Sequence, residues 1–112
     1  DRLDTALQGE AVVIGDLVLL EILQGFRREA DYQQAKLLLQ HLAIYDLLGR
    51  DAVEEYARYF RILRKRGITI RKTADVIIAG FCIVNRIPLL FEDKDFRPFV
   101  KHLGLRSVLQ AA

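Results

Sequence analysis

The sequence has neither methionine nor tryptophan, and only one cysteine and two prolines among its 112 residues. A lone cysteine excludes an internal disulfide. Because Cys82 lies among apolar residues, we expect a packed core thiol there rather than a nucleophile. No apolar run reaches the roughly 18 residues of a membrane-spanning helix. No charged-then-apolar leader opens the chain, so we expect a cytoplasmic protein.

A strong excess of either charge is also missing, because 17 lysines and arginines stand against 15 aspartates and glutamates. This balance argues against a histone-like or tail-like nucleic-acid binder but leaves room for a local basic patch. The two histidines, His41 and His102, are isolated, so no zinc site is expected. With 52% hydrophobic residues, the chain has the length and composition of one ordinary domain over residues 1–112.

Short apolar runs alternate with helical patterns along the chain. Four of these runs predict strands, at residues 11–14, 43–47, 88–91 and 105–108. Helices are expected around them, at residues 17–25, 31–42, 51–66, 74–85 and 95–102. Apolar strands separated by helices are typical of an α/β fold with a parallel sheet covered on both faces. Such sheets bind ligands at the carboxyl ends of their strands, so the residues just after each strand are the first candidates for function.

Four carboxylates stand in unusual surroundings for charged side chains. Glu21 lies inside an otherwise apolar helix, Asp75 opens another, and Asp93 and Asp95 follow the predicted strand at 88–91. A carboxylate among leucines and isoleucines must reach water, a partner or a metal, because burying it alone is very costly. If the four acids meet at one edge of a parallel sheet, they form a site for a hard divalent cation such as Mg²⁺ or Mn²⁺.

Each acid also has an ordinary structural explanation. A first-turn aspartate such as Asp75 usually complements the helix dipole, and Asp93 and Asp95 suit a turn and an N-cap. Glu21 would find a partner in an arginine such as Arg71. The joint placement of the four acids, rather than any one of them, favours a metal-binding site.

Basic residues are concentrated between positions 61 and 72. For those from 61 to 66 we favour a solvated helix end whose charges suit the helix dipole. Arg71 and Lys72 lie next to Asp75 and are better candidates for contacts with RNA phosphates. Thr73 fits the N-cap of the following helix, with a minority role in holding a carboxylate or a metal-bound water.

The stretches VVIGDLVLLEILQGF (12–26) and RKTADVIIAGFCIVNRIPLLFEDKDF (71–96), with the closing HLGLRSVL, carry the motifs E-x-x-x-G, D-x-x-I-A and D-x-D-F. In order and spacing they resemble the PIN-domain family, and within it the VapC toxins of bacterial and archaeal toxin–antitoxin pairs. The resemblance implies a three-layer sandwich and a Mg²⁺- or Mn²⁺-dependent ribonuclease. Carried over by position, Glu21, Asp75 and Asp93 match metal-site acids, and Asp95 matches a further acid of the same cluster.

The same resemblance implies three partners: an RNA substrate, a VapB-type antitoxin that occupies the active groove, and a second copy of the chain in a homodimer. The helix around Glu21 has more apolar surface than one sheet contact uses. We therefore expect antitoxin docking or dimerisation at four of its residues, namely Leu19, Leu20, Leu23 and Phe26.

One feature of the family has no match, namely its first strand, which normally ends in Val-Asp-Thr-Ser or similar and supplies a central metal ligand. Because the sequence begins with Asp1-Arg2-Leu3 instead of methionine, we expect that strand to precede the given chain. Without it, a catalytically silent PIN-like module that binds RNA or a partner protein is the main alternative. A receiver-like α/β domain fits less well, because no strand-end aspartate is paired with a lysine after a later strand.

Overall fold

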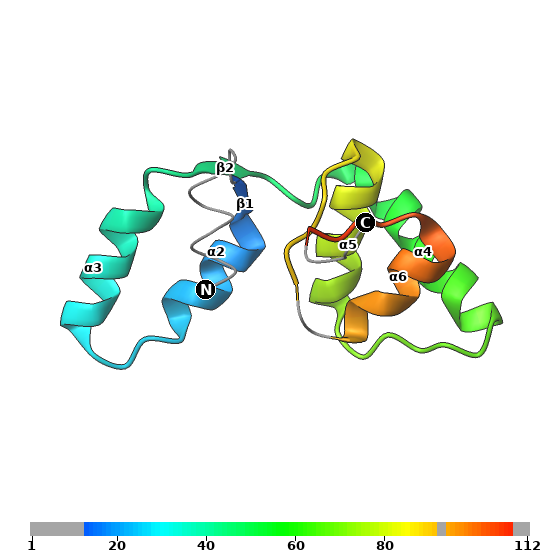
Figure 1. The fold of residues 1–112 in the computed structure, drawn as a ribbon, viewed down its shortest axis with the longest axis horizontal. Coiled ribbons are helices and arrows are strands. Elements are labelled where there is room, and N and C mark those ends of the chain that lie inside the picture. The colour runs from blue at the N-terminus through cyan, green and yellow to red at the C-terminus, as the bar shows by residue number, and fades with distance from the viewer. Residues whose placement is uncertain (1–12, 92–93, 109–112) are drawn as a thin grey trace. The chain divides into compact units, whose positions relative to one another are not determined.

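The computed structural model describes residues 13–91 and 94–108, and residues 1–12, 92–93 and 109–112 lie outside the described part (Figure 1). The chain divides into two compact units, Asp1–Leu47 and Leu48–Ala112. They are called the N-terminal unit and the C-terminal unit below. The single domain expected over the whole chain remains a prediction.

The N-terminal unit contains a small parallel sheet and two helices. Strand β1 (Val13–Gly15) pairs in parallel with β2 (Ala43–Tyr45). Helices α2 (Asp16–Gln24) and α3 (Glu29–Leu39) connect the two strands and contact each other. Isoleucine in the strands suits an extended backbone, and the leucine-rich segment after β1 suits a helix. The parallel pairing predicted for the first two strands is therefore confirmed.

Asp16 and Gly15 join the start of α2 to the end of β2. The Oδ1 atom of Asp16 accepts hydrogen bonds from the backbone N–H groups of Leu17 (2.7 Å) and Leu47 (3.1 Å). Leu47 is buried against Gly15, and any side chain at that glycine would collide with it. Asp16 is the first residue of the helix and Gly15 is its N-cap, so the aspartate connects two elements.

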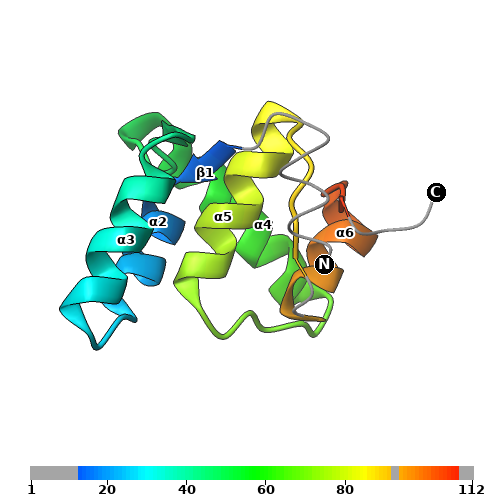
Figure 2. The ribbon, with the colours of Figure 1, turned by 60° about the vertical axis from the view of Figure 1, so that its left-hand side comes forward.

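The C-terminal unit is helical. It contains η1 (Arg50–Ala52), α4 (Val53–Lys65), α5 (Thr73–Asn85), η2 (Lys94–Phe96) and α6 (Arg97–Leu103). Helix α4 packs along α5, and α6 contacts α4 (Figure 2). The chain turns after α4 at Gly67 and after α6 at Gly104, where φ is +81° and +80°. Glycine adopts this left-handed backbone without the steric cost that other residues pay.

The core of the C-terminal unit lies between these helices. Leu63 of α4 and Phe99 of α6 are its fully buried large side chains. A Cβ atom on Gly80 would lie 2.5 Å from Cδ1 of Tyr56, so this glycine allows α4 and α5 to pack closely. Cys82 is buried here as expected, and burial raises the pKa of its thiol to about 11.

The prediction of continuous strands at 88–91 and 105–108 is wrong. Within the described residues only an isolated parallel bridge joins Leu89 to Ser107. The N–H of Leu89 donates to the carbonyl of Arg106 (2.8 Å), and the N–H of Val108 donates to the carbonyl of Leu89 (3.0 Å). Pro88 has no N–H to extend this ladder. The described part is thus mostly helical with one small parallel sheet, and a three-layer sandwich is not confirmed.

The expected helices are all present, with shifted ends. The helix expected at 31–42 begins and ends earlier, as α3, with Glu29 and Asp31 in its first turn, where acidic side chains complement the helix dipole. The segments expected at 51–66 and 95–102 each begin with a short 3-10 turn, η1 or η2. In the described part of the chain, every helix falls short of the length and apolar character needed to cross a membrane.

Candidate active site

Asp75 is the one buried charged residue among the described residues, with 8% of its surface exposed. It lies in the first turn of α5, where its backbone N–H donates to the carbonyl of Lys72 (3.0 Å). The next residues, Val76, Ile78 and Ala79, are buried and hold this turn against the core. The positive end of the helix dipole favours an ionised carboxylate at this place. The helix therefore presents a nearly enclosed acid at a defined position.

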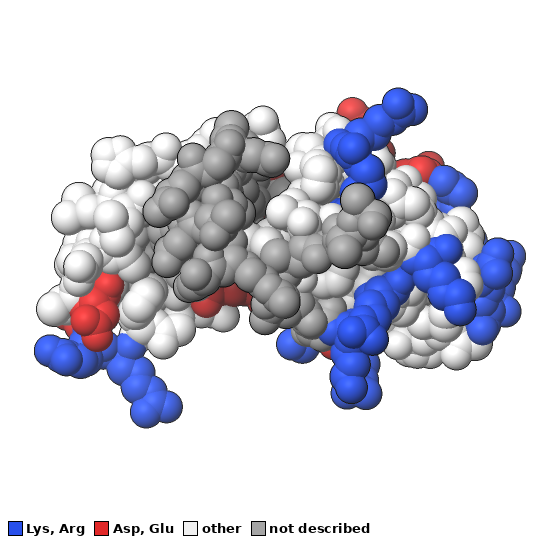
Figure 3. All heavy atoms as spheres, viewed as in Figure 1, with Lys and Arg blue, Asp and Glu red and all other residues white. Residues whose placement is uncertain are grey.

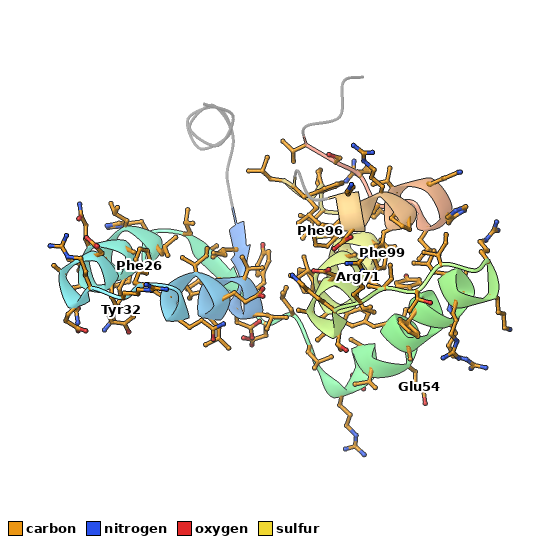
Figure 4. The ribbon with its side chains drawn as sticks, turned by 90° about the horizontal axis from the view of Figure 1, so that it is seen from below. Phe26, Tyr32, Glu54, Arg71, Phe96 and Phe99 are labelled. Carbon is orange, nitrogen blue, oxygen red and sulfur yellow. The ribbon has the colours of Figure 1, made fainter. Side chains whose placement is uncertain are left out.

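Asp95 lies on η2, a short turn that contacts α5, and its side chain is half-buried. The next residue, Phe96, anchors the turn. Its ring lies 5.2 Å from that of Phe91 and 6.4 Å from that of Phe99, measured between centroids. Figure 4 labels Phe96 and Phe99 within the C-terminal unit, in the same region of the view as Arg71. Asp75 and Asp95, the two described acids of this unit that we predicted as ligands, thus belong to elements in contact.

The described structure does not test whether the other two predicted ligands reach this site. Asp93 lies outside the described residues. Glu21 is exposed on α2 in the N-terminal unit, so water can solvate its carboxylate. Its convergence with Asp75 therefore stays a prediction.

The donor atoms suit a hard cation, but the described residues do not complete a metal site. Asp75 and Asp95 offer carboxylate oxygens, which Mg²⁺ and Mn²⁺ prefer. Within residues 13–91 and 94–108, no group of three or more His, Cys, Asp or Glu side chains is placed to hold a metal ion. The complete ligand set predicted from the sequence is therefore untested.

Exposed cations precede the buried acid. Arg71 and Lys72 are both exposed immediately before α5. Lys72 is the N-cap residue, with an extended backbone (φ −118°, ψ 123°) and no side-chain cap. Thr73 is the first helical residue, so its predicted N-cap role is wrong. The carbonyl of Lys72 accepts the Asp75 N–H directly, and a threonine cap is not needed at that position.

Two arginines of α4 are engaged within the helix itself, namely Arg58, which precedes the basic run, and Arg64, which belongs to it. Nη2 of Arg58 lies 2.7 Å from Oε2 of Glu55. Hydrogen bonds from Arg58, and then from Tyr59, lower the pKa of Glu55 to about 2. The guanidinium of Arg64 lies over the ring of Phe60, 5.4 Å from its centroid. The contact of Arg64 with Phe60 agrees with the structural role favoured for residues 61–66. Arg66, at the end of this run, is the exception.

The charge of Arg66, at the C-terminal end of α4, acts on His102 of α6, a helix that contacts α4. Half-burial, and then the positive charges of Arg66 and Lys101, lower the pKa of His102. From the sequence, His102 is an isolated histidine and Arg66 is part of a solvated helix end. No local sequence pattern predicts that these two residues lie near each other, because α4 and α6 come together only in the tertiary fold.

Buried Asp75 in the first turn of α5, Asp95 on the contacting turn η2 and the exposed Arg71 and Lys72 just before α5 make this region the candidate active site. The sequence model of the PIN domain matches residues 1–100. The chain therefore belongs to the PIN-domain family. PIN domains are typically nucleases, they generally use divalent metal ions, and membership implies RNA binding in general terms.

Proposed function

We propose that the protein is a metal-dependent endoribonuclease and the toxin component of a type II toxin–antitoxin system of the VapC kind. The observation that carries the proposal is the burial of Asp75 in the first turn of α5, within the motif D-x-x-I-A. Asp75 offers carboxylate oxygens from a fixed position on its helix, and the family chemistry places a divalent cation beside a phosphodiester at such acids.

In this proposal Asp75, Asp93, Glu21 and Asp95 hold Mg²⁺ or Mn²⁺. When bound, the cation supplies an activated water and offsets charge on the scissile phosphate. Asp75 contributes an oxygen held in place by its helix turn. One carboxylate of the set accepts the proton of the attacking water. Arg71, Lys72 and Thr73 contact the phosphate of the RNA, where the two cations draw the backbone toward the acids.

The decisive experiment measures cleavage of a labelled RNA with Mg²⁺ or Mn²⁺. Asp75→Asn keeps the size of the side chain but removes the charge, and we expect at least about a 100-fold loss of rate. Asp51→Asn, at an exposed position in the same unit, serves as the matched control and should keep full activity. Cleavage by the Asp75→Asn protein that persists in EDTA would exclude the mechanism.

A catalytically silent module that binds RNA or a partner protein is the second candidate. Calorimetry with Mn²⁺ separates the two proposals without relying on activity. Heat of binding that disappears in Asp75→Asn supports the nuclease, and a folded protein with no heat of binding supports the silent module.

We also propose a VapB-type antitoxin and a homodimer as partners. Support comes from the N-terminal unit, where Leu20 of α2 is 56% exposed and Leu38 of α3 is 66% exposed. Of the apolar residues that we predicted as a docking surface, Leu20 and Phe26 are exposed, whereas Leu19 and Leu23 are half-buried. Exposed apolar patches commonly mark protein interfaces. Light scattering of the purified protein, alone and with the antitoxin, measures both assemblies.

A further inference from the structure

Three cationic or titratable side chains converge where the end of α4 meets α6. Arg66 is the C-cap residue of α4, and Lys101 and His102 lie in the last turn of α6. Helices α4 and α6 are in contact, and the positive charges of Arg66 and Lys101 both act on His102. Neither Arg66 nor Lys101 forms an ion pair within 4.0 Å with any residue in the part of the chain that the structure describes. Among the described residues, therefore, no ion pair neutralises either of these two charges.

The cluster continues toward the acids along α6. Arg97 precedes Lys101 by four residues, so the two side chains lie on the same face of α6, about 6 Å apart along its axis. Arg97 in turn directly follows η2, which carries Asp95. Along the chain, the exposed residues 71 and 72 lie between Arg66 and the first turn of α5. Figure 3 shows lysine and arginine side chains projecting from the C-terminal unit on this face.

The net charge of the whole chain is close to zero, but its two units carry net charges of opposite sign. Residues 48–112 contain 13 lysines and arginines and seven aspartates and glutamates. Residues 1–47 contain four basic and eight acidic residues. Like charges that converge without a counter-charge repel one another, and a bound polyanion relieves this repulsion. Guanidinium and ammonium groups are the donors that bind phosphate best among side chains.

We propose that Arg66, Lys101 and His102, extended by Arg97, bind the phosphate backbone of RNA and lead the strand toward Asp75 and Asp95. The proposal rests on the proposed ribonuclease function and adds the path of the substrate outside the acidic site. Binding at this surface needs no metal ion, because its contacts are between cations and phosphates. Affinity for RNA can therefore be measured separately from cleavage.

The test measures the affinity of the full chain for a short, labelled single-stranded RNA by fluorescence anisotropy in EDTA. The double variant Arg66→Glu, Lys101→Glu should bind roughly tenfold or more weakly. The slope of log affinity against log salt should fall by about 1.4, since each phosphate contact on a single strand contributes about 0.7. The matched control is Arg27→Glu, Lys36→Glu, which changes the net charge equally at exposed positions of the N-terminal unit and should bind within about twofold of the unaltered protein.

Equal weakening by both double variants would show a bulk-charge effect and overturn the proposal, as would an unaltered protein that fails to bind RNA. Circular dichroism checks that each variant is folded. If the glutamates disturb folding, Arg66→Gln, Lys101→Gln removes the same contacts with a milder change and should weaken binding in the same direction.

His102 gives an independent readout by NMR. Bound phosphates offset the charges of Arg66 and Lys101, so saturating RNA should raise the pKa of His102. An unchanged His102 titration in the complex contradicts binding at this surface. If the protein never cleaves RNA but these binding results hold, the nuclease function fails and the surface stands. If Asp75→Asn abolishes cleavage while both double variants bind normally, the surface fails and the nuclease stands.

Discussion

The two units bury apolar side chains to very different extents. Among the described residues, the N-terminal unit buries two, Ile14 and Leu47, while the C-terminal unit buries eleven, from Tyr56 to Leu105. Large apolar side chains that remain exposed follow the opposite trend. In the N-terminal unit they are Leu20, Ile22, Phe26, Leu37, Leu38, Ile44 and Tyr45. Because apolar burial is the main stabilising contribution to folding, the C-terminal unit contains most of the stabilising core.

The difference in apolar burial matches the two roles proposed for the units, an acidic site in the C-terminal unit and a docking surface in the N-terminal unit. The C-terminal unit carries Asp75, whose buried position depends on a packed helix, and the basic surface formed by two helices in contact. The N-terminal unit carries exposed Glu21 beside exposed leucines, which suits a surface that other molecules cover. A precise acid needs a rigid support, whereas a docking surface needs apolar area left exposed to solvent.

The largest effect is expected when the same substitution, phenylalanine to alanine, is made in each of the two units. Phe99→Ala removes a fully buried ring from the C-terminal unit, and we expect a loss of about 3–5 kcal/mol in the free energy of unfolding. Phe26→Ala removes a ring that is 39% exposed in the N-terminal unit, and about 1 kcal/mol or less is expected. Urea denaturation followed by circular dichroism measures both values. Equal losses would mean that the N-terminal unit contributes as much core as the C-terminal unit.

A smaller effect is expected from adding one methyl group to a glycine in each unit. Gly80→Ala places a Cβ atom 2.5 Å from Cδ1 of buried Tyr56, and the overpacking should cost about 1–3 kcal/mol. In Gly25→Ala, at the end of α2, the new Cβ atom has its closest neighbour, the carbonyl oxygen of Ile22, at 3.5 Å, and φ is −79°. That change should be neutral or stabilising by up to about 1 kcal/mol. The melting temperatures of the two variants measure the difference, and a stabilised Gly80→Ala protein would contradict close packing of α4 on α5.

The smallest effect concerns two exposed ion pairs with the same spacing. Glu55 and Arg58 approach to 2.7 Å in the C-terminal unit, while Arg28 and Asp31 are 4.0 Å apart in the N-terminal unit. The folded-state pKa of Glu55 is lowered from 4.5 to about 2, so its contribution to stability is present above pH 4.5 and is lost as the pH falls toward 2.

Melting temperatures measured between pH 5 and 2 test this dependence. The difference between the unaltered protein and Glu55→Gln should shrink steadily toward acid pH. Asp31→Asn, which removes the longer and more exposed pair, should leave the melting temperature nearly unchanged throughout. A difference for Glu55→Gln that stays constant with pH would contradict the lowered pKa.

The local elements could be predicted from the sequence because their signals are local. Apolar residues at 11–14 and 43–47 indicated two strands. Strands β1 (Val13–Gly15) and β2 (Ala43–Tyr45) overlap these positions and pair in parallel, although the residues of β2 are exposed. The positions of the helices, and of Asp75 in the first turn of one of them, followed from apolar periodicity and flanking residues. The prediction of strands at 88–91 and 105–108 was wrong because a strand needs a hydrogen-bonded partner along its whole length. Their apolar composition does not reveal that only one bridge forms.

Sequence alone therefore determined the helices and the first parallel strand pair, since propensity and side-chain pattern act over a few residues. The tertiary structure decided that Asp75 is buried, that Tyr56 packs against Gly80, and that Arg66 of α4 lies near enough for its charge to act on His102 of α6. These are contacts between residues far apart in the chain. They depend on how helix surfaces fit together, which the local pattern of a sequence does not specify.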